Sequence, residues 1–266
     1  MVTMYGPRTG EAPAARYGPV DRVAVLSDVH ANVPALEAVL AEVARRGADL
    51  VVFCGDLTWG PEPDRTMEIV TGLEGRARFV RGNGERAVVD LVRGNRPAER
   101  EREYWMMARH SPASLRFVAE LPFSVVVEVT GLGPVRFCHG SPRSDTELVT
   151  PGTPAERITA LTAGVDEPTL VTGHTHLQFD RMVAGRRSVG PGSVGLPFHD
   201  GEPGVAQWAL LGPDVVLRQT RYDVDLAIAR ATRAGDPGAS TIAKLLTSPP
   251  SVAGAIEQAE GKVFSG

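Results

Sequence analysis

The sequence has few cysteines and no long apolar segment. Its two cysteines, Cys54 and Cys138, are too few for a disulfide framework, and both lie in apolar runs where we expect small buried side chains. No run of 18 apolar residues and no signal-peptide pattern is present. These features predict a cytoplasmic protein that does not insert into a membrane.

The sequence also lacks an excess of positive charge. It has 28 basic and 32 acidic side chains, for a net charge of −4, so there is no overall basic field to gather nucleic acid non-specifically. Only Lys244 and Lys262 are lysines. The dominance of arginine suits recognition of phosphate or carboxylate, and it is equally explained by genome composition.

The length and composition are those of a folded globular protein. The 266 residues are 42% hydrophobic and 23% charged. Residues 1–20 mix Gly, Pro, Arg and Ala without periodicity, which predicts a flexible leader. We expect residues 21–266 to form a single domain that ends in C-terminal helices at about 223–266, and we leave open whether it forms a homo-oligomer.

The apolar periodicity predicts two sheets. Strands at 22–27, 50–54 and 77–80 alternate with helices at 34–46 and 63–73, an order typical of parallel strands with helical cover. After a helical stretch at 84–120, strands are expected at 123–129, 135–138, 169–172, 178–184, 205–211 and 214–221. Further helices are expected near 154–163 and at 223–234, 239–247 and 251–260.

Side chains that bind metals follow five of these strands. They stand in Asp28-Val29-His30, Gly55-Asp56, Gly82-Asn83, His139-Gly140 and Gly173-His174-Thr175-His176. Any one of them alone is readily explained as a turn residue or a hydrogen-bonded core residue. Because open α/β sheets place their binding crevices at the carboxyl ends of strands, the whole set predicts one site on one rim.

These motifs, in this order, resemble those of the calcineurin-like metallophosphoesterases, which are D-x-H, G-D, G-N-H-D/E, a late H-G and G-H-x-H. The resemblance covers residues 22 to 222, and its Pro191–Gly195 turn is similar to that of the small bacterial phosphodiesterase branch. It implies an α/β fold, a four-layer α/β/β/α sandwich of two mixed sheets flanked by helices, with the site at one edge between the sheets.

The resemblance also implies two divalent metal ions and their ligands. One metal would be held by Asp28, His30, Asp56 and His176, and the second by Asp56, Asn83, His139 and His174, with Asp56 as the bridge. Imidazole and oxygen ligands without thiolate suit manganese, our working assignment, and also iron, nickel, cobalt or zinc. Two such metals activate a bridging water as hydroxide and clamp the phosphoryl oxygens.

One motif departs from the family pattern, because Gly84 stands where the family carries a histidine that assists the leaving group. A general acid contributes about 10² to 10⁴ in rate. Either His199 or His110 substitutes for it, or the protein favours activated leaving groups. Glycine would also widen the site for a diester or a bulky nucleotide. Gly84→His would then raise turnover of substrates with poor leaving groups. Alternatively, Gly84 only relaxes a turn before a helix.

Other residues have two interpretations each. His199 is either a catalytic group or an exposed loop histidine, and Arg143 either binds substrate phosphate or forms a surface ion pair. The cluster Tyr104-Trp105-Met106-Met107 either caps a substrate base or belongs to the core or a subunit contact.

We therefore expect a dinuclear metal-dependent phosphoesterase, either a phosphodiesterase or a phosphatase. Its substrate would be nucleotide-like or a small phosphorylated organic compound, and Asp56, Asn83, His139 and His199 would take part in catalysis. The alternative is a catalytically impaired scaffold of the same fold that acts through protein contacts. A nuclease is disfavoured because no basic, aromatic-laced tract is present.

Overall fold

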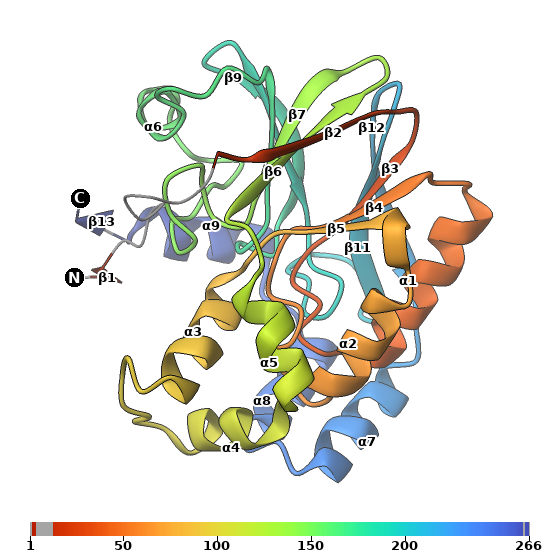
Figure 1. Cartoon of the computed structure of the whole chain (residues 1–266), viewed down its shortest axis with the longest axis vertical. Helices are drawn as coiled ribbons and strands as arrows, with labels where there is room; N and C mark the ends of the chain where they lie inside the picture. The colour runs from red at the N-terminus through yellow and green to blue at the C-terminus, as the bar shows by residue number, and fades with distance from the viewer. Residues whose placement is uncertain (1, 4–12, 263, 266) are drawn as a thin grey trace.

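The structure is a computed structural model that describes residues 2–3, 13–262 and 264–265. Its two ends meet, because β1 (Val2–Thr3) pairs in parallel with β13 (Phe264–Ser265) (Figure 1). Among the described residues, no helix is both long and apolar enough to cross a bilayer.

The first sheet has five strands in the order β12-β11-β3-β4-β5. Their bounds are β3 (Val23–Leu26), β4 (Leu50–Phe53), β5 (Ala77–Phe79), β11 (Val205–Leu211) and β12 (Val215–Arg221). Strands β3, β4 and β5 are parallel, whereas β11 runs antiparallel to β3 and β12. The sheet is therefore mixed, and its parallel part carries the first three predicted motifs.

The second sheet has six strands in the order β2-β6-β7-β8-β10-β9. Their bounds are β2 (Ala15–Val20), β6 (Ser124–Val129), β7 (Gly133–Cys138), β8 (Thr169–Thr172), β9 (Gln178–Val183) and β10 (Arg186–Pro191). It is also mixed, with β7, β8 and β10 parallel to one another.

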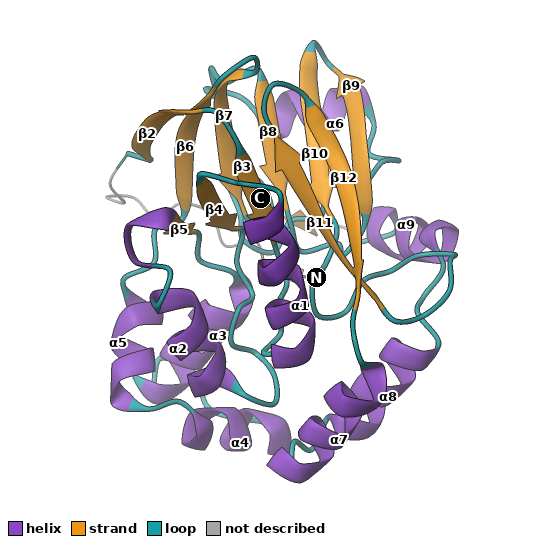
Figure 2. Ribbon diagram, turned by 90° about the vertical axis from the view of Figure 1, so that its right-hand side faces the viewer, coloured by secondary structure: helices purple, strands orange, loops and turns teal. Residues whose placement is uncertain are grey.

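The helices fall into three groups along the chain. The first group comprises α1 (Val33–Arg45), α2 (Pro63–Thr71), the 3-10 turn η1 (Glu74–Arg76), α3 (Asn83–Val92), α4 (Glu101–Arg109) and α5 (Pro112–Ala119). Helix α6 (Ala155–Leu161) stands alone. The C-terminal group comprises α7 (Val224–Ala234), α8 (Ala239–Thr247) and α9 (Val252–Glu260), and α4, α7 and α8 gather at one end of the molecule (Figures 1 and 2).

Alternation along β3 separates two cores. Ala24 and Leu26 pack with residues of α1 such as Leu36 and Val39, which form the core between the first sheet and its helices. Val23 and Val25 face the other way and pack against residues of the second sheet. A third core lies between the far side of the second sheet, α6 and α9. This sequence of helices, sheet, sheet and helices confirms the predicted four-layer arrangement (Figure 2).

The prediction of a flexible leader at residues 1–20 is wrong for its last part. Ala15–Val20 form β2, which pairs in parallel with β6 at the edge of the second sheet. Its side chains are mostly exposed, so backbone pairing rather than an apolar pattern specifies the strand. Residues 4–12 of the predicted leader lie outside the described residues.

The sequence also failed to indicate β10, whose end, Gly190-Pro191, lacks the usual strand composition. All the strands and helices that the sequence predicted are present. The predicted helical region at 84–120 forms three helices, α3, α4 and α5.

Candidate metal centre

The seven predicted ligands lie at the carboxyl ends of five strands. Asp28 and His30 follow β3, Asp56 follows β4, and Asn83 begins α3 after β5; these come from the first sheet. His139 follows β7, and His174 and His176 follow β8, in the second sheet. The fold thus brings loops from both sheets to one rim.

The ligand atoms form two groups. The first contains Asp28, His30 and His176, and the second contains Asp56, His139 and His174; within each group the ligand atoms lie within 4.8 Å of one another. In the first group, Nε2 of His176 is 3.3 Å from Oδ1 of Asp28.

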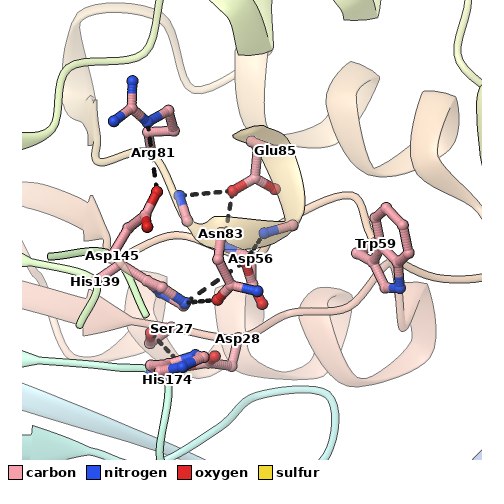
Figure 3. Close-up of polar contacts among 12 residues, drawn as sticks. Ser27, Asp28, Asp56, Trp59, Arg81, Asn83, Glu85, His139, Asp145 and His174 are labelled. Carbon is pink, nitrogen blue, oxygen red and sulfur yellow. Dashed lines mark hydrogen bonds and ion pairs between the residues drawn. The ribbon is translucent and has the colours of Figure 1, made fainter. Parts of the chain in front are cut away.

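The second group lies next to Asn83. Nε2 of His139 is 2.9 Å from Oδ1 of Asn83 and 3.5 Å from Oδ1 of Asp56 (Figure 3). The rings of His139 and His174 stand 4.8 Å apart, centroid to centroid. Asp56 also connects the two groups, because its Oδ2 is 3.9 Å from Nε2 of His30.

Backbone carbonyls orient three of the imidazoles. Nδ1 of His30 lies 3.1 Å from the Trp59 carbonyl, and Nδ1 of His176 lies 2.6 Å from the Leu196 carbonyl. Nδ1 of His139 lies 2.7 Å from the Cys54 carbonyl. A carbonyl only accepts hydrogen bonds, so each Nδ1 carries a proton and donates it, which directs the Nε2 of each ring into the site as a ligand atom.

This arrangement places acceptors face to face. Nε2 of His30 and Nε2 of His176 are only 3.1 Å apart. When both imidazoles are neutral and held by their Nδ1–H groups, they present lone pairs to each other at that distance, and a cation between them removes the repulsion. The residues therefore fit divalent metal ions.

Asp28 offers one oxygen and keeps the other engaged. Its Oδ2 accepts hydrogen bonds from the Ser27 hydroxyl at 2.5 Å and from the backbone N–H of His174 at 3.0 Å. Its Oδ1 is buried and makes no hydrogen bond. A buried carboxylate oxygen without a donor is costly, so an unpartnered Oδ1 beside His176 is a second observation that fits a bound cation.

Burial and the neighbouring charges shift the pKa values of Asp28 and Asp56 in opposite directions. Burial raises the pKa of Asp56 to about 7, although the nearby His139 opposes the rise. Burial acts the same way on Asp28, but His176 and the other imidazoles outweigh it and hold its pKa below the usual range. Asp28 therefore keeps its negative charge, whereas Asp56 needs a nearby positive charge to ionise fully at neutral pH.

The histidines also divide into two kinds. Burial and His176 lower the pKa of His30 to about 3, and burial with His139 lowers that of His174 well below its usual value. The pKa values of His139 and His176 are raised despite burial, because Asp56 attracts the first and Asp28 the second. His30 and His174 are thus neutral imidazoles at pH 7, the form that binds metals.

The loop that carries Asp56 is held by Glu85, a buried carboxylate in the first turn of α3. Its Oε2 accepts from the backbone N–H groups of Asp56 at 2.8 Å and Gly82 at 2.9 Å (Figure 3). Its Oε1 accepts from the N–H groups of Leu57 at 2.8 Å and Thr58 at 3.1 Å. One carboxylate therefore fixes two loops that carry predicted ligands.

The backbone at the site is strained. Eight non-glycine residues in the described part of the chain have positive φ, and five of them are predicted ligands: Asp28, His30, Asp56, His174 and His176. Left-handed conformations cost of order 1–3 kcal/mol in non-glycine residues and concentrate at functional sites. Here they turn each side chain out of its strand toward the shared rim.

The prediction that Gly84 opens space in the site is wrong. A Cβ built on Gly84 would lie 2.9 Å from Oδ1 of Asp56 and 2.9 Å from the Cβ of Trp59, both closer than atoms pack. The backbone N–H of Gly84 also donates to Oδ1 of Asp56 at 2.7 Å. Glycine is therefore needed for close packing against Asp56 and Trp59.

Three predicted residues lie apart from the ligand groups. The guanidinium of Arg143 forms two hydrogen bonds with Glu147, at 3.0 and 2.8 Å. Arg143 therefore forms an ion pair, the second of its two interpretations. His199 is only 7% exposed, so the exposed-loop interpretation is wrong; its Nδ1 accepts from the N–H of Gly201. His110 is buried and donates to the Met106 carbonyl at 2.8 Å.

The aromatic cluster on α4 does not act as one unit. Met106 is fully buried, which fits the core interpretation. Tyr104 is 61% exposed and donates its hydroxyl hydrogen to the Ala98 carbonyl. The Arg109 guanidinium lies 5.0 Å from the centre of the Trp105 ring. Cys54 and Cys138 are buried and unpaired, and burial raises the pKa of both thiols, as expected for inert side chains.

Sequence reasoning missed three residues that contact the ligand loops: Ser27, Glu85 and Trp59. Ser27 and Trp59 stand next to the first and second motifs, but neither residue type indicates a metal. The third motif predicts Asn83 as a ligand and gives Glu85 no role, although a glutamate three residues after Gly82 at a helix start is a recognisable cap.

Comparisons with known proteins agree with this geometry. A family model described as the calcineurin-like phosphoesterase superfamily domain matches residues 22–210. The crystal structure of a metallophosphoesterase from Sphaerobacter thermophilus is 26% identical, with a TM-score of 0.68, over 89% of this chain and 99% of that one.

Two further proteins are also similar. The structure of hypothetical protein PH1004 from Pyrococcus horikoshii has a TM-score of 0.71 at 19% identity, over 86% of this chain and 99% of that one, which shows a shared fold. The uncharacterized protein MJ0912 of Methanocaldococcus jannaschii is 27% identical over 128 residues, which is 46% of this chain and 50% of that protein. The alignment thus spans about half the length of this curated relative.

Proposed function

Because the chain belongs to the calcineurin-like phosphoesterase superfamily, we propose that it hydrolyses a phosphodiester or phosphomonoester with the help of two divalent metal ions. The substrate class we propose is a nucleotide-like or small phosphorylated organic compound. The observation that carries the proposal is the pair of facing acceptor groups, above all the two Nε2 atoms 3.1 Å apart and the unpartnered Oδ1 of Asp28.

We assign the ligands as the family pattern suggests. Asp28, His30 and His176 would hold one metal, and Asn83, His139 and His174 the other, with Asp56 shared between them. The two side-chain groups found around these residues support this division, and the 3.9 Å approach of Asp56 to His30 supports its shared role. Manganese remains the metal we propose; a ligand set without thiolate suits it, and suits iron, nickel, cobalt or zinc as well.

When bound, two such cations lower the pKa of a water molecule and neutralise the phosphoryl oxygens. The chain's own residues prepare for this. The carbonyl groups fix the imidazole tautomers, Glu85 fixes the Asp56 loop, and Ser27 fixes one oxygen of Asp28. Because these groups are buried and already oriented, little reorganisation is needed when the substrate binds.

The test is hydrolysis of bis-p-nitrophenyl phosphate and p-nitrophenyl phosphate by the manganese-loaded protein. Asp56→Asn is the matched variant, since it keeps the side-chain size and removes the charge. We expect turnover of at least one ester by the wild type and loss of nearly all turnover in Asp56→Asn. Preference for one ester then decides between phosphodiesterase and phosphatase.

Absence of turnover together with absence of bound metal would contradict the proposal and favour a binding scaffold. Equal turnover by the wild type and Asp56→Asn would contradict it as well, because that result indicates a contaminating enzyme.

A further inference from the structure

We propose that Trp59 takes the place of the histidine missing at Gly84 and binds the organic part of the substrate by stacking. The substrates of this site are then phosphoesters with a planar aromatic leaving group, such as an aryl or nucleoside group. This inference rests on the proposed phosphoesterase function and names its substrate class.

Trp59 lies beside the metal centre, against the residue that replaced the histidine. A Cβ on Gly84 would approach the Cβ of Trp59 to 2.9 Å, so the tryptophan packs directly over this position. Figure 3 shows its indole next to the first turn of α3, on the side of Asp56 and Asn83 away from His139.

The position of Trp59 is fixed by its backbone. Its carbonyl accepts the hydrogen bond from Nδ1 of His30 at 3.1 Å. The next residue, Gly60, packs so closely on the His30 backbone that a Cβ there would overlap the His30 carbonyl. On the other side, Thr58 is held by Glu85 at 3.1 Å. The indole is therefore attached to a segment that is rigid relative to the ligands.

The fold nevertheless buries the side chain of Trp59 only in part. It is partly exposed, and in the described part of the chain its ring N–H donates to no acceptor. Tryptophan indoles that serve only the core are commonly buried with the N–H bonded, as in Trp208, which is fully buried and donates to Thr220 at 2.9 Å. Part of the indole packs against the core between the first sheet and its helices, and its exposed part, with the N–H, is available to a substrate.

The chemistry of indole decides what it contributes. Its N–H donates a hydrogen bond but does not release a proton at neutral pH, so Trp59 cannot act as the general acid. Its large flat face stacks on aromatic rings. A site with a stacking surface and no acid at this position selects leaving groups that are aromatic and already stable as anions.

Among the described residues, the other candidates predicted from the sequence do not reach this position. Among the contacts of the described residues, neither His199 nor His110 touches any of the seven predicted ligands, and both use Nδ1 elsewhere. Tyr104 is directed to the Ala98 carbonyl. Trp59 borders the Gly84 position through its Cβ, and its backbone carbonyl binds a predicted ligand, His30.

The test compares two non-hydrolysable inhibitors, phenylphosphonate and methylphosphonate, against hydrolysis of p-nitrophenyl phosphate. Both carry the phosphonate group, and only the first has a ring. We expect the wild type to bind phenylphosphonate more tightly. In Trp59→Ala the inhibition constant for phenylphosphonate should rise about 5- to 100-fold, the range of one aromatic stack, while that for methylphosphonate stays within twofold.

Two variants serve as controls. Trp59→Phe keeps a ring and should retain most of the preference for phenylphosphonate. Tyr104→Ala removes an exposed aromatic side chain elsewhere and should leave both constants unchanged. Retention of normal metal content in Trp59→Ala shows that the metal centre is intact.

An unchanged ratio of the two constants in Trp59→Ala, with hydrolysis preserved, overturns the role of Trp59 and leaves the phosphoesterase function standing. If Trp59→Ala does not fold, equal inhibition constants for both phosphonates with the wild type and Trp59→Phe overturn it instead. Absence of any hydrolysis by the wild type, together with absence of bound metal, overturns both proposals together.

Discussion

The buried carboxylate of Glu85 accepts a hydrogen bond from the backbone N–H of Asp56 at 2.8 Å. The same carboxylate binds the N–H of Gly82, which precedes Asn83. Two predicted ligands that follow different strands, Asp56 and Asn83, are therefore positioned by one side chain that is not itself a predicted ligand.

Replacing Glu85 by Gln places an amide NH₂ among backbone N–H donors and loosens both loops. We expect metal affinity and turnover to fall by roughly 10- to 100-fold, the usual effect of losing a group that orients ligands. Calorimetric metal titration of Glu85→Gln measures this.

Glu167→Gln is the matched control, since Glu167 is a buried carboxylate that binds Arg16 and Arg136 rather than a ligand loop. It should lower stability without changing metal affinity. A metal affinity unchanged in Glu85→Gln would show that Glu85 does not position Asp56.

Substituting Gly84 tests the close packing around Asp56. The new Cβ of Gly84→Ala would press on Oδ1 of Asp56 at 2.9 Å, so we expect at least a tenfold loss of turnover or metal affinity. Gly84→His carries the same Cβ and should lose activity rather than gain it. Gly75→Ala is the control, because a Cβ at Gly75 meets nothing within 4 Å. Wild-type activity in Gly84→Ala would contradict this account.

The C-terminal helices are tied to α4 by a buried ion pair. Arg102 forms two hydrogen bonds of 2.8 Å with Asp236, whose side chain is fully buried between α7 and α8. Asp236→Asn leaves the guanidinium without its charge partner, and we expect a loss of about 2 kcal/mol, or a fall in Tm of roughly 4–8 °C.

Thermal unfolding monitored by circular dichroism measures this change. Glu68→Gln, which removes an exposed partner of Arg65, should leave Tm unchanged. Equal Tm values for Asp236→Asn and the wild type would show that the pair does not secure these helices.

The free energy of unfolding depends on pH through Asp64. Burial alone raises the pKa of Asp64, but hydrogen bonds from Ser114 and Ser111 outweigh it and hold the pKa below its usual 3.8. A lowered folded-state pKa stabilises the protein above pH 3.8, and this contribution is lost as pH falls through the folded-state value.

Because Asp64 is only partly buried and solvent screens its charge, the contribution is only about 1 kcal/mol at pH 7. We expect Asp64→Asn to be less stable than the wild type at pH 7 in urea unfolding, and the difference to shrink below pH 4. A difference that stays constant or grows with acidity would contradict the sign of the shift.

The sequence predicted the elements whose side-chain pattern is strong. Val23–Leu26 and Leu50–Phe53 are fully buried apolar runs followed by polar motifs, so both the strands and the rim were predicted from residue order. It missed Ala15–Val20, where exposed residues pair through the backbone alone.

The rest of the site depends on contacts between distant segments, which residue order does not contain. Gly84 looked like an opening because glycine has no side chain, whereas Trp59, 25 positions earlier, fills the space. Likewise, Arg143 looked available for phosphate until its pairing with Glu147 was known.

The central claim is that this rim holds two divalent cations, one on each side of Asp56. The most direct measurement is anomalous diffraction at the manganese absorption edge from crystals soaked in Mn²⁺. The account predicts two anomalous peaks, one among Asp28, His30 and His176 and the other among Asp56, His139 and His174. A single peak, or none at this rim, would contradict it.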